Sequence, residues 1–404
     1  MSDSTLPTST DVKTNTIGRA IWAILPLVLL AGVIALFVLG GTLTPTSADL
    51  PPIEELSISK VLLPAPDQVI VQVTNSGPQP VTIAQVIIDD AYWNFSIEPG
   101  NELQRLTEAT IDIPYPWNAG DAHTIFLVTS TGTLFEASIP VALETPAINF
   151  STFLNFALIG LYIGVVPVGL GMMWHPFMRG LKRRMLDAIL ALTIGLLAFL
   201  LIETASDGLE IANRVPGAFR GLILFGAGGI LSYLFIQIIS SRKKSKKDEA
   251  SDRLNVSRLL ATGIGLHNLA EGLAVGAAYA SGATALGAFL VIGFILHNVT
   301  EGIGIAAPVA EDRPPFKAFL LLAGLAGLPA IVGAWIGGFI YSDLAAAIFL
   351  GVGTGAIVQV IVEVGKLLTR HAQRDNANVT SWQNAIGFTL GLGIMYATAL
   401  LVAV

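Results

Sequence analysis

Long apolar runs alternate with short polar segments along most of the chain. The first run, residues 20–41, holds 22 consecutive uncharged residues, enough for a helix to cross the roughly 30 Å hydrocarbon layer of a membrane. This run is longer than the core of a signal peptide, so we expect it to be retained as a membrane helix. Eight further apolar runs bring the prediction to nine spans: 153–174, 185–202, 221–240, 259–280, 285–309, 318–341, 344–364 and 385–404.

The charges between these runs predict the orientation, because short cytoplasmic loops collect Lys and Arg. With the N-terminus inside, the inner segments hold 18 of the 22 Lys and Arg residues. We therefore expect an integral cell-membrane protein with a cytoplasmic tail over 1–19, an N-terminal transmembrane helix over 20–42 and an extracytoplasmic C-terminus. The most basic inner segment is a predicted cytoplasmic loop over 241–257.

Residues 51–146 follow a different pattern, with short runs that alternate apolar and polar residues with period two. Val69, Val71 and Val73 would share one face of a strand, and Thr131-Gly132 would join two later strands as a hairpin. About seven short strands in this region predict a small all-β sandwich of immunoglobulin-like type, placed outside the cytoplasm by the orientation above.

Composition narrows the possible functions. Hydrophobic residues make up 53% of the chain and charged residues 13%, about half the usual share in soluble domains, which excludes an ordinary soluble protein. A net charge of −7 gives no basic surplus, so we expect no nucleic-acid partner. The chain has no cysteine, which excludes disulfides, thiolate metal sites and cysteine nucleophiles.

One six-residue pattern occurs twice within the predicted membrane helices. Residues 267–272 read His-Asn-Leu-Ala-Glu-Gly, and residues 297–302 read His-Asn-Val-Thr-Glu-Gly. Positions four apart share a helix face, so His267 would stand beside Glu271 and His297 beside Glu301. Ionised groups at this depth cost about 2.5–3.5 kcal/mol each on insertion scales, so the two pairs indicate a cation pathway rather than a simple packing contact.

Imidazole and carboxylate together suit Zn²⁺, Fe²⁺, Mn²⁺, Co²⁺ or Cd²⁺ better than Cu⁺, Ca²⁺ or Mg²⁺. Asn268 and Asn298 could add amide oxygens to such a site. We expect the metal to be a transported substrate, with no other cofactor and no enzymatic activity. An intramembrane zinc hydrolase that activates water with the same side chains is an alternative, and so is a metal sensor that signals through the β domain.

At these motifs the sequence resembles the ZIP (Zrt/Irt-like) family of divalent-metal transporters, whose fourth and fifth helices carry motifs of this kind. The resemblance covers 149–404 and implies an eight-helix bundle that carries zinc or a similar ion toward the cytoplasm, with one group of helices sliding against the other. The family pattern implies a metal site made by matching residues here: His267, Asn268, Glu271, His297, Asn298 and Glu301.

The chain departs from the family pattern at several positions. Ala270 and Thr300 stand where many relatives have Pro before the Glu, so no proline kink is expected there. Many relatives also carry an acid in the sixth family helix, and the region around Gly327 holds none, which favours one metal over two. Gly272 and Gly302 are expected to let helices approach closely.

Several other polar residues are weaker candidates. Glu203 and Asp207 could recruit cations at the entrance or simply solvate a helix end, and Glu363 could serve the exit or cap a helix beside a lysine. The remaining histidines are expected to be lone surface residues: His123, His175 and His371. The acidic β domain could concentrate cations, stay solvated, or hold a homodimer together; the bilayer is the other expected partner.

Overall fold

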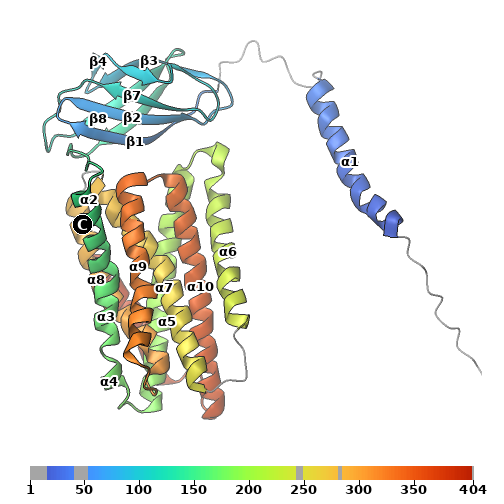
Figure 1. Ribbon diagram of the computed structural model, residues 1–404, viewed down its shortest axis with the longest axis vertical. Helices are drawn as coiled ribbons and strands as arrows, with labels where there is room; N and C mark the ends of the chain where they lie inside the picture. The colour runs from blue at the N-terminus through green and yellow to red at the C-terminus, as the bar shows by residue number, and fades with distance from the viewer. Residues whose placement is uncertain (1–15, 41–52, 243–248, 281–283, 403–404) are drawn as a thin grey trace, which may run out of the picture. The chain divides into compact units, whose positions relative to one another are not determined.

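The computed structural model describes residues 16–40, 53–242, 249–280 and 284–402 (Figure 1). The chain divides into two units, residues 1–53 and 54–404. In the first unit, α1 (Thr16–Gly40) is a single apolar helix with Pro26 inside it. This helix covers nearly all of the first predicted span, residues 20–41. Of the predicted tail, residues 1–15 lie outside the described residues.

The period-two region folds into two antiparallel sheets made of nine strands, two more than the sequence pattern predicted. The strands are β1 (Leu56–Ala65), β2 (Gln68–Asn75), β3 (Val81–Ile88), β4 (Ala91–Trp93), β5 (Ser96–Glu98), β6 (Glu102–Leu103), β7 (Glu108–Ile113), β8 (His123–Thr129) and β9 (Leu134–Ile139). One sheet has the order β1-β2-β7-β5, and the other has β4-β3-β8-β9 with β6 paired to β3.

The alternation in β2 determines which side chains enter the core of this domain. Val69, Val71 and Val73 are buried, as the period-two pattern predicted, and their neighbours Ile70 and Gln72 are only partly buried. The hairpin at Thr131-Gly132 is also present, because β8 and β9 pair on either side of it. Gly132 takes a φ of +87°, a backbone conformation that glycine adopts without strain.

The rest of the chain is helical, and a helix lies at the position of every predicted span. The segment Phe150–Met178 contains α2 (Phe150–Gly160), a π-helical turn η1 (Leu161–Val165), α3 (Val166–Met172) and α4 (His175–Met178). The others are α5 (Arg183–Arg214), η2 (Gly217–Phe219), α6 (Gly221–Arg242), α7 (Glu249–Ala280), α8 (Thr284–Ala306), η3 (Ala307–Val309), α9 (Phe316–Ile340), α10 (Asp343–Arg374) and α11 (Trp382–Val402).

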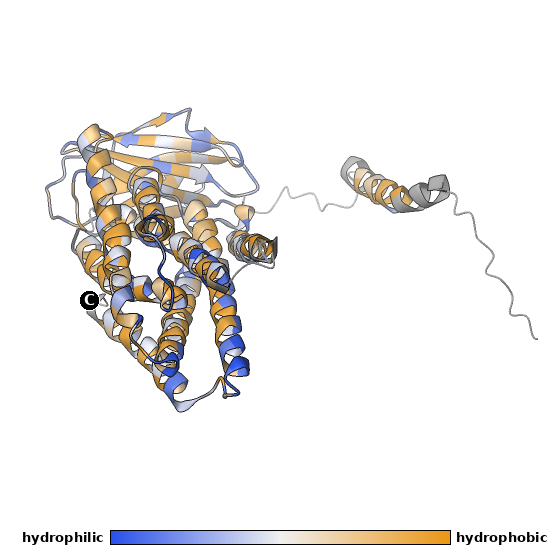
Figure 2. Cartoon of the chain, turned by 60° about the horizontal axis from the view of Figure 1, so that its bottom comes forward, coloured by the Kyte–Doolittle hydropathy of each residue, from blue (hydrophilic) through white to orange (hydrophobic). Residues whose placement is uncertain are grey.

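Six of these segments in the described residues are long and apolar enough to cross a membrane. Figure 2 shows hydrophobic residues along the helices and hydrophilic ones near several helix ends. Charged ends do not stop a helix, so α6 and α7 extend into the predicted basic loop from both sides, as far as Arg242 and from Glu249. The remaining loop residues, 243–248, lie outside the described part of the chain.

Helix starts follow local capping chemistry. The Asn149 side chain accepts a hydrogen bond from the Thr152 N–H at 2.9 Å at the start of α2. Ser342 accepts from the Ala345 N–H at 3.2 Å at the start of α10. Each cap satisfies one of the backbone donors that the first turn of a helix leaves open.

The helices form two sets, each held together by close backbone contacts at glycines. Close contacts of this kind define a first set that contains α2, η1, α3, α7, α8 and α9. An added Cβ at Gly272 on α7 would lie 2.9 Å from the Ala334 nitrogen on α9, and one at Gly302 on α8 would lie 3.0 Å from Gly171 Cα on α3. Both glycines therefore permit a close helix approach, but to α9 and α3 rather than between the two motif helices α7 and α8.

The second set contains α5, α6, α10 and α11. An added Cβ at Gly391 on α11 would lie 2.9 Å from the Leu196 nitrogen on α5, and one at Gly355 on α10 would lie 2.6 Å from the Gly229 carbonyl carbon on α6. Helices of different sets also pack against one another, as α7 does against α10, but their contacts at glycines are looser or involve side chains. At Gly353 on α10, for example, an added Cβ would meet His267 Cα on α7 at 3.6 Å, an ordinary van der Waals distance.

Candidate metal centre

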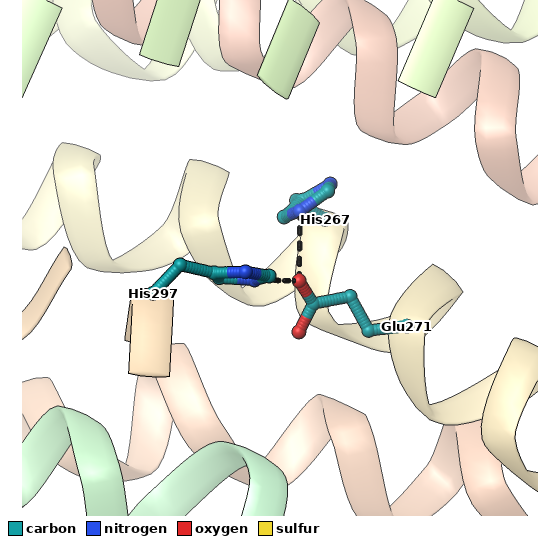
Figure 3. Close-up of side chains that lie close together, drawn as sticks. All are labelled: His267, Glu271 and His297. Carbon is teal, nitrogen blue, oxygen red and sulfur yellow. Dashed lines mark hydrogen bonds and ion pairs between the residues drawn. The ribbon is translucent and has the colours of Figure 1, made fainter. Parts of the chain in front are cut away.

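Helices α7 and α8 bring one carboxylate and two imidazoles together inside the bundle (Figure 3). His267 and Glu271 lie one turn apart on α7, and His267 Nε2 is 3.1 Å from Glu271 Oε1. His297 on α8 directs its own Nε2 to the same carboxylate oxygen. The ligand atoms of the three residues all lie within 4.8 Å of one another, and the side chains are only 4–6% exposed.

The second oxygen of Glu271 is held by an asparagine and, through it, by the π-helical turn. Asn298 Nδ2 donates to Glu271 Oε2 at 2.9 Å and to the Ile163 carbonyl in η1 at 2.7 Å. A π turn carries an extra residue and shifts the carbonyls from their α-helical partners. The hydrophobic pattern does not indicate η1, but Pro167, four residues after Ile163, has no N–H to donate to the Ile163 carbonyl, which leaves this carbonyl open to Asn298.

The other two motif residues take different positions. Asn268 Nδ2 donates to the Ala326 carbonyl on α9 at 3.0 Å. Glu301 is 2% exposed, and neither of its carboxylate oxygens has a hydrogen-bond partner among the described residues. The amide oxygens of both asparagines are buried and equally unpartnered in that part of the chain. The structure thus gathers His267, Glu271 and His297 in one cluster and places Glu301 outside it.

A buried hydroxyl that the sequence did not single out completes the surroundings of His267. Thr204 on α5 is 3% exposed, and its Oγ1 lies 3.2 Å from His267 Nδ1. The two ring nitrogens of His267 therefore face different partners, Nε2 the carboxylate of Glu271 and Nδ1 the threonine hydroxyl. The two residues are 63 positions apart, and no spacing or motif in the sequence links them.

The entrance candidates line the same cavity as the cluster. This cavity has a volume of about 140 Å³ and is bordered by helices of both sets, including Glu203 and Asp207 on α5. Glu363 lines a separate cavity of about 470 Å³, together with Asp252 and Asn255. Its carboxylate is buried and accepts hydrogen bonds from Lys366 Nζ at 2.9 Å and Gln359 Nε2 at 3.4 Å.

The interpretation of the remaining histidines as lone surface residues was wrong. His175 is 7% exposed and donates from Nε2 to the Val309 carbonyl at 3.0 Å. His371 Nδ1 lies 2.6 Å from Asp187 Oδ1, 184 residues away in sequence. Each of these histidines joins two distant segments, which the position in sequence alone does not reveal.

His123 is likewise buried in the β domain, where it donates from Nδ1 to Asp89 Oδ2 at 2.6 Å. Tyr115 donates to the same oxygen at 2.8 Å, and the Thr124 N–H donates to Oδ1 at 3.0 Å. Partial burial raises the pKa of Asp89. These hydrogen bonds and the imidazole lower the pKa by more than burial raises it, so the net pKa lies below its ordinary value of 3.8. The cluster links β3, β8 and the segment between β7 and β8.

The donor set fits a divalent transition metal. Two imidazole nitrogens and a carboxylate oxygen match the mixed ligands of zinc and its neighbours. The unpartnered oxygens of Glu301, Asn268 and Asn298 are buried acceptors that a cation or a proton would satisfy. Helix α9 has no acidic residue, and at Gly327 an added Cβ would lie 2.5 Å from the Val165 nitrogen, so this position serves helix packing.

Comparison with known proteins bears on the same region. A family model described as the ZIP zinc transporter matches residues 239–399, a stretch that includes both six-residue motifs. A comparison with curated proteins finds no match.

Proposed function

Because residues 239–399 match the family model of the ZIP zinc transporter, a family of membrane transporters of divalent metals, we propose that this chain moves a divalent transition-metal ion, zinc foremost, toward the cytoplasm. The observation that carries the proposal is the shared carboxylate oxygen of Glu271, which two imidazoles from two different helices approach. Three ligand atoms from α7 and α8 would bind the ion within the bundle.

The proposed site has a core and a surrounding group. His267, Glu271 and His297 form the core, because their ligand atoms already lie close together. Glu301 and the amide oxygens of Asn268 and Asn298 would complete the coordination as the ion moves, since they are buried acceptors without hydrogen-bond partners among the described residues. A single metal is favoured, because α9 offers no acid at Gly327.

The path to and from this site would use the two cavities. Glu203 and Asp207 would attract the ion at the entrance, since they line the cavity that contains the cluster. Glu363 would receive it on the inner side, since its carboxylate lines the larger cavity with Asp252. A carboxylate held by Lys366 would bind an arriving cation by exchanging one positive partner for another.

The proposed topology has nine spans, with α1 added before an eight-helix transporter domain over 149–404. Its support is the distribution of charge, with 18 of the 22 Lys and Arg residues on the proposed inner side. The N-terminus would be cytoplasmic, and the β domain and C-terminus would lie outside.

We also propose that the β domain, 51–146, is an immunoglobulin-like sandwich. Its two sheets, β1-β2-β7-β5 and β4-β3-β8-β9, have the strand order of sheets ABED and C′CFG in that fold. Its local charge of −10 would favour cations near the entrance, and a domain of this kind could also pair two copies of the chain.

Metal uptake tests the proposed function. Wild type, Glu271→Ala and the control Glu102→Ala, which removes an exposed carboxylate in the β domain, would be expressed in cells that lack their own metal uptake. Intracellular Zn, Fe, Mn, Co and Cd would be measured by elemental mass spectrometry. We expect wild type and Glu102→Ala to accumulate at least one metal and Glu271→Ala to accumulate none above background. Equal accumulation of every metal in all three strains would contradict the proposal.

A further inference from the structure

We propose that Thr204 is a positioning residue of the metal site. Its hydroxyl accepts a hydrogen bond from His267 Nδ1–H, which leaves the lone pair of Nε2 free to bind the ion. This inference rests on the proposed function, because it assigns a role to Thr204 within the same site. It adds a residue from α5 to a centre otherwise built from α7 and α8.

The chemistry of imidazole explains why such a partner matters. In a neutral imidazole, one nitrogen carries the proton and the other holds the lone pair that binds metal. Thr204 Oγ1 lies 3.2 Å from His267 Nδ1, and His267 Nε2 lies 3.1 Å from Glu271 Oε1, within the ligand cluster. A hydrogen bond that holds the proton on Nδ1 therefore fixes both the tautomer and the direction of the ring.

The orientation of the Thr204 hydroxyl is unusual among the threonines of these helices. A threonine inside a helix commonly donates to the carbonyl four residues earlier. Five threonines of the bundle do so at 2.8–3.0 Å: Thr193, Thr262, Thr354, Thr369 and Thr389. The Thr204 hydroxyl instead lies within hydrogen-bond distance of a side chain on another helix. A buried hydroxyl directed at the back of a ligand is the contact expected of a positioning residue.

The contact also crosses the boundary between the two helix sets. Thr204 belongs to the set of α5, and His267 to the set of α7. Gly353 on α10 borders both residues, since its added Cβ would lie 3.6 Å from His267 Cα and 3.8 Å from Thr204 Cγ2. If one set slides against the other, the hydrogen bond breaks and His267 becomes free to turn. Thr204 thus couples the geometry of the ligand to the relative position of the two sets.

Three variants of purified full-length protein test the role of the hydroxyl. Thr204→Val keeps the branched shape and removes the hydroxyl, and Thr204→Ser keeps the hydroxyl. Thr193→Val makes the same change at a buried threonine of α5 whose hydroxyl donates to the Ile189 carbonyl of its own helix. Zinc affinity would be measured by competition with a fluorescent chelator, and zinc uptake in vesicles would give KM and maximal rate. We expect Thr204→Val to weaken zinc binding about 10- to 100-fold and to raise KM, the usual cost of losing such a partner.

The matched variants make the outcome decisive. We expect Thr204→Ser and Thr193→Val to stay within about threefold of wild type, and Thr204→Val to add no further loss in a His267→Ala background. Wild-type affinity in Thr204→Val, equal losses in Thr204→Ser and Thr204→Val, or additive losses with His267→Ala would overturn the inference. Thr204→Ala replaces Thr204→Val if the latter fails to give a monodisperse protein. A wild type that neither binds nor transports any metal would instead contradict the proposed function.

Discussion

Gly272 follows Glu271 directly and sets how closely α7 approaches α9. An added Cβ at this position would lie 2.9 Å from both the Ala330 carbonyl carbon and the Ala334 nitrogen, and nearer still to the Ala330 carbonyl oxygen. Carbon contacts are favourable at about 3.5–4.0 Å, so Gly272→Ala creates an overlap of roughly 0.6–1 Å. Both partners are backbone atoms of a helix, which no change of rotamer can move aside. The two helices must therefore separate.

The size of the effect follows from this separation. Overpacking of a close contact costs about 1–3 kcal/mol. Because all the nearest atoms are backbone atoms, we take the upper end of this range. The change of Gly to Ala returns up to about 1 kcal/mol through helix propensity, so we expect a net loss of roughly 2 kcal/mol of stability. The larger effect concerns the site. A binding constellation tolerates about 0.5 Å of misplacement, and the Glu271 carboxylate would shift by more than that relative to His297.

Gly393→Ala on α11 is the matched control, because an added Cβ there meets nothing within 4 Å. Thermal unfolding and zinc uptake would be measured for both variants in purified form. We expect Gly272→Ala to unfold at a lower temperature and to lose most uptake, while Gly393→Ala behaves as wild type or slightly better. If the two variants show the same stability and the same uptake, the reasoning about α7 and α9 is refuted.

Two further predictions concern hydrogen bonds. Asn298→Ala removes the donor to both the Ile163 carbonyl and Glu271 Oε2, whereas Asn268→Ala removes the donor to the Ala326 carbonyl. We therefore expect thermal unfolding to show a loss of stability that is larger for Asn298→Ala, by about 0.6–1.7 kcal/mol. Equal losses would contradict this. In the β domain, the lowered pKa of Asp89 means that its carboxylate contributes stability above pH 3.8 and that this contribution is lost as the pH falls through the lowered pKa. Hydrogen exchange of β3 and β8, corrected for the intrinsic rate, should show this acid loss in wild type and a flatter pH profile in Asp89→Asn; parallel profiles would exclude Asp89 as the cause.

The sequence predicted the elements that depend on composition and period. Apolar runs predicted the positions of the long helices but not of the short ones α4 and η2. The spacing of His267 and Glu271 correctly predicted their contact, because a helix fixes the geometry of residues four apart. The same rule paired His297 with Glu301, whereas His297 contacts Glu271. The rule describes one helix, and the angle at which α8 meets α7 decides which carboxylate an imidazole reaches.

Features that depend on contacts between distant segments could not be predicted. The π turn η1 lies among apolar residues, and its extra residue leaves no trace in the hydrophobic pattern, yet its Ile163 carbonyl anchors Asn298. Thr204 and His267 are 63 residues apart, and no motif joins them. For the same reason, a histidine such as His371 looks isolated in the sequence although Asp187 binds it.

The glycine contacts determine where this molecule is stiff and where it is compliant. Backbone pressed against backbone has no rotamers to change, so a displacement of α9 is passed to α7 almost undiminished, and the same holds for α10 and α6. The helices can shift more easily at the boundary between the sets, where side chains can reorient. The backbone that carries His267, Glu271 and His297 belongs to one stiff body and is bordered by the other, so any shear along that boundary moves these three backbone positions together.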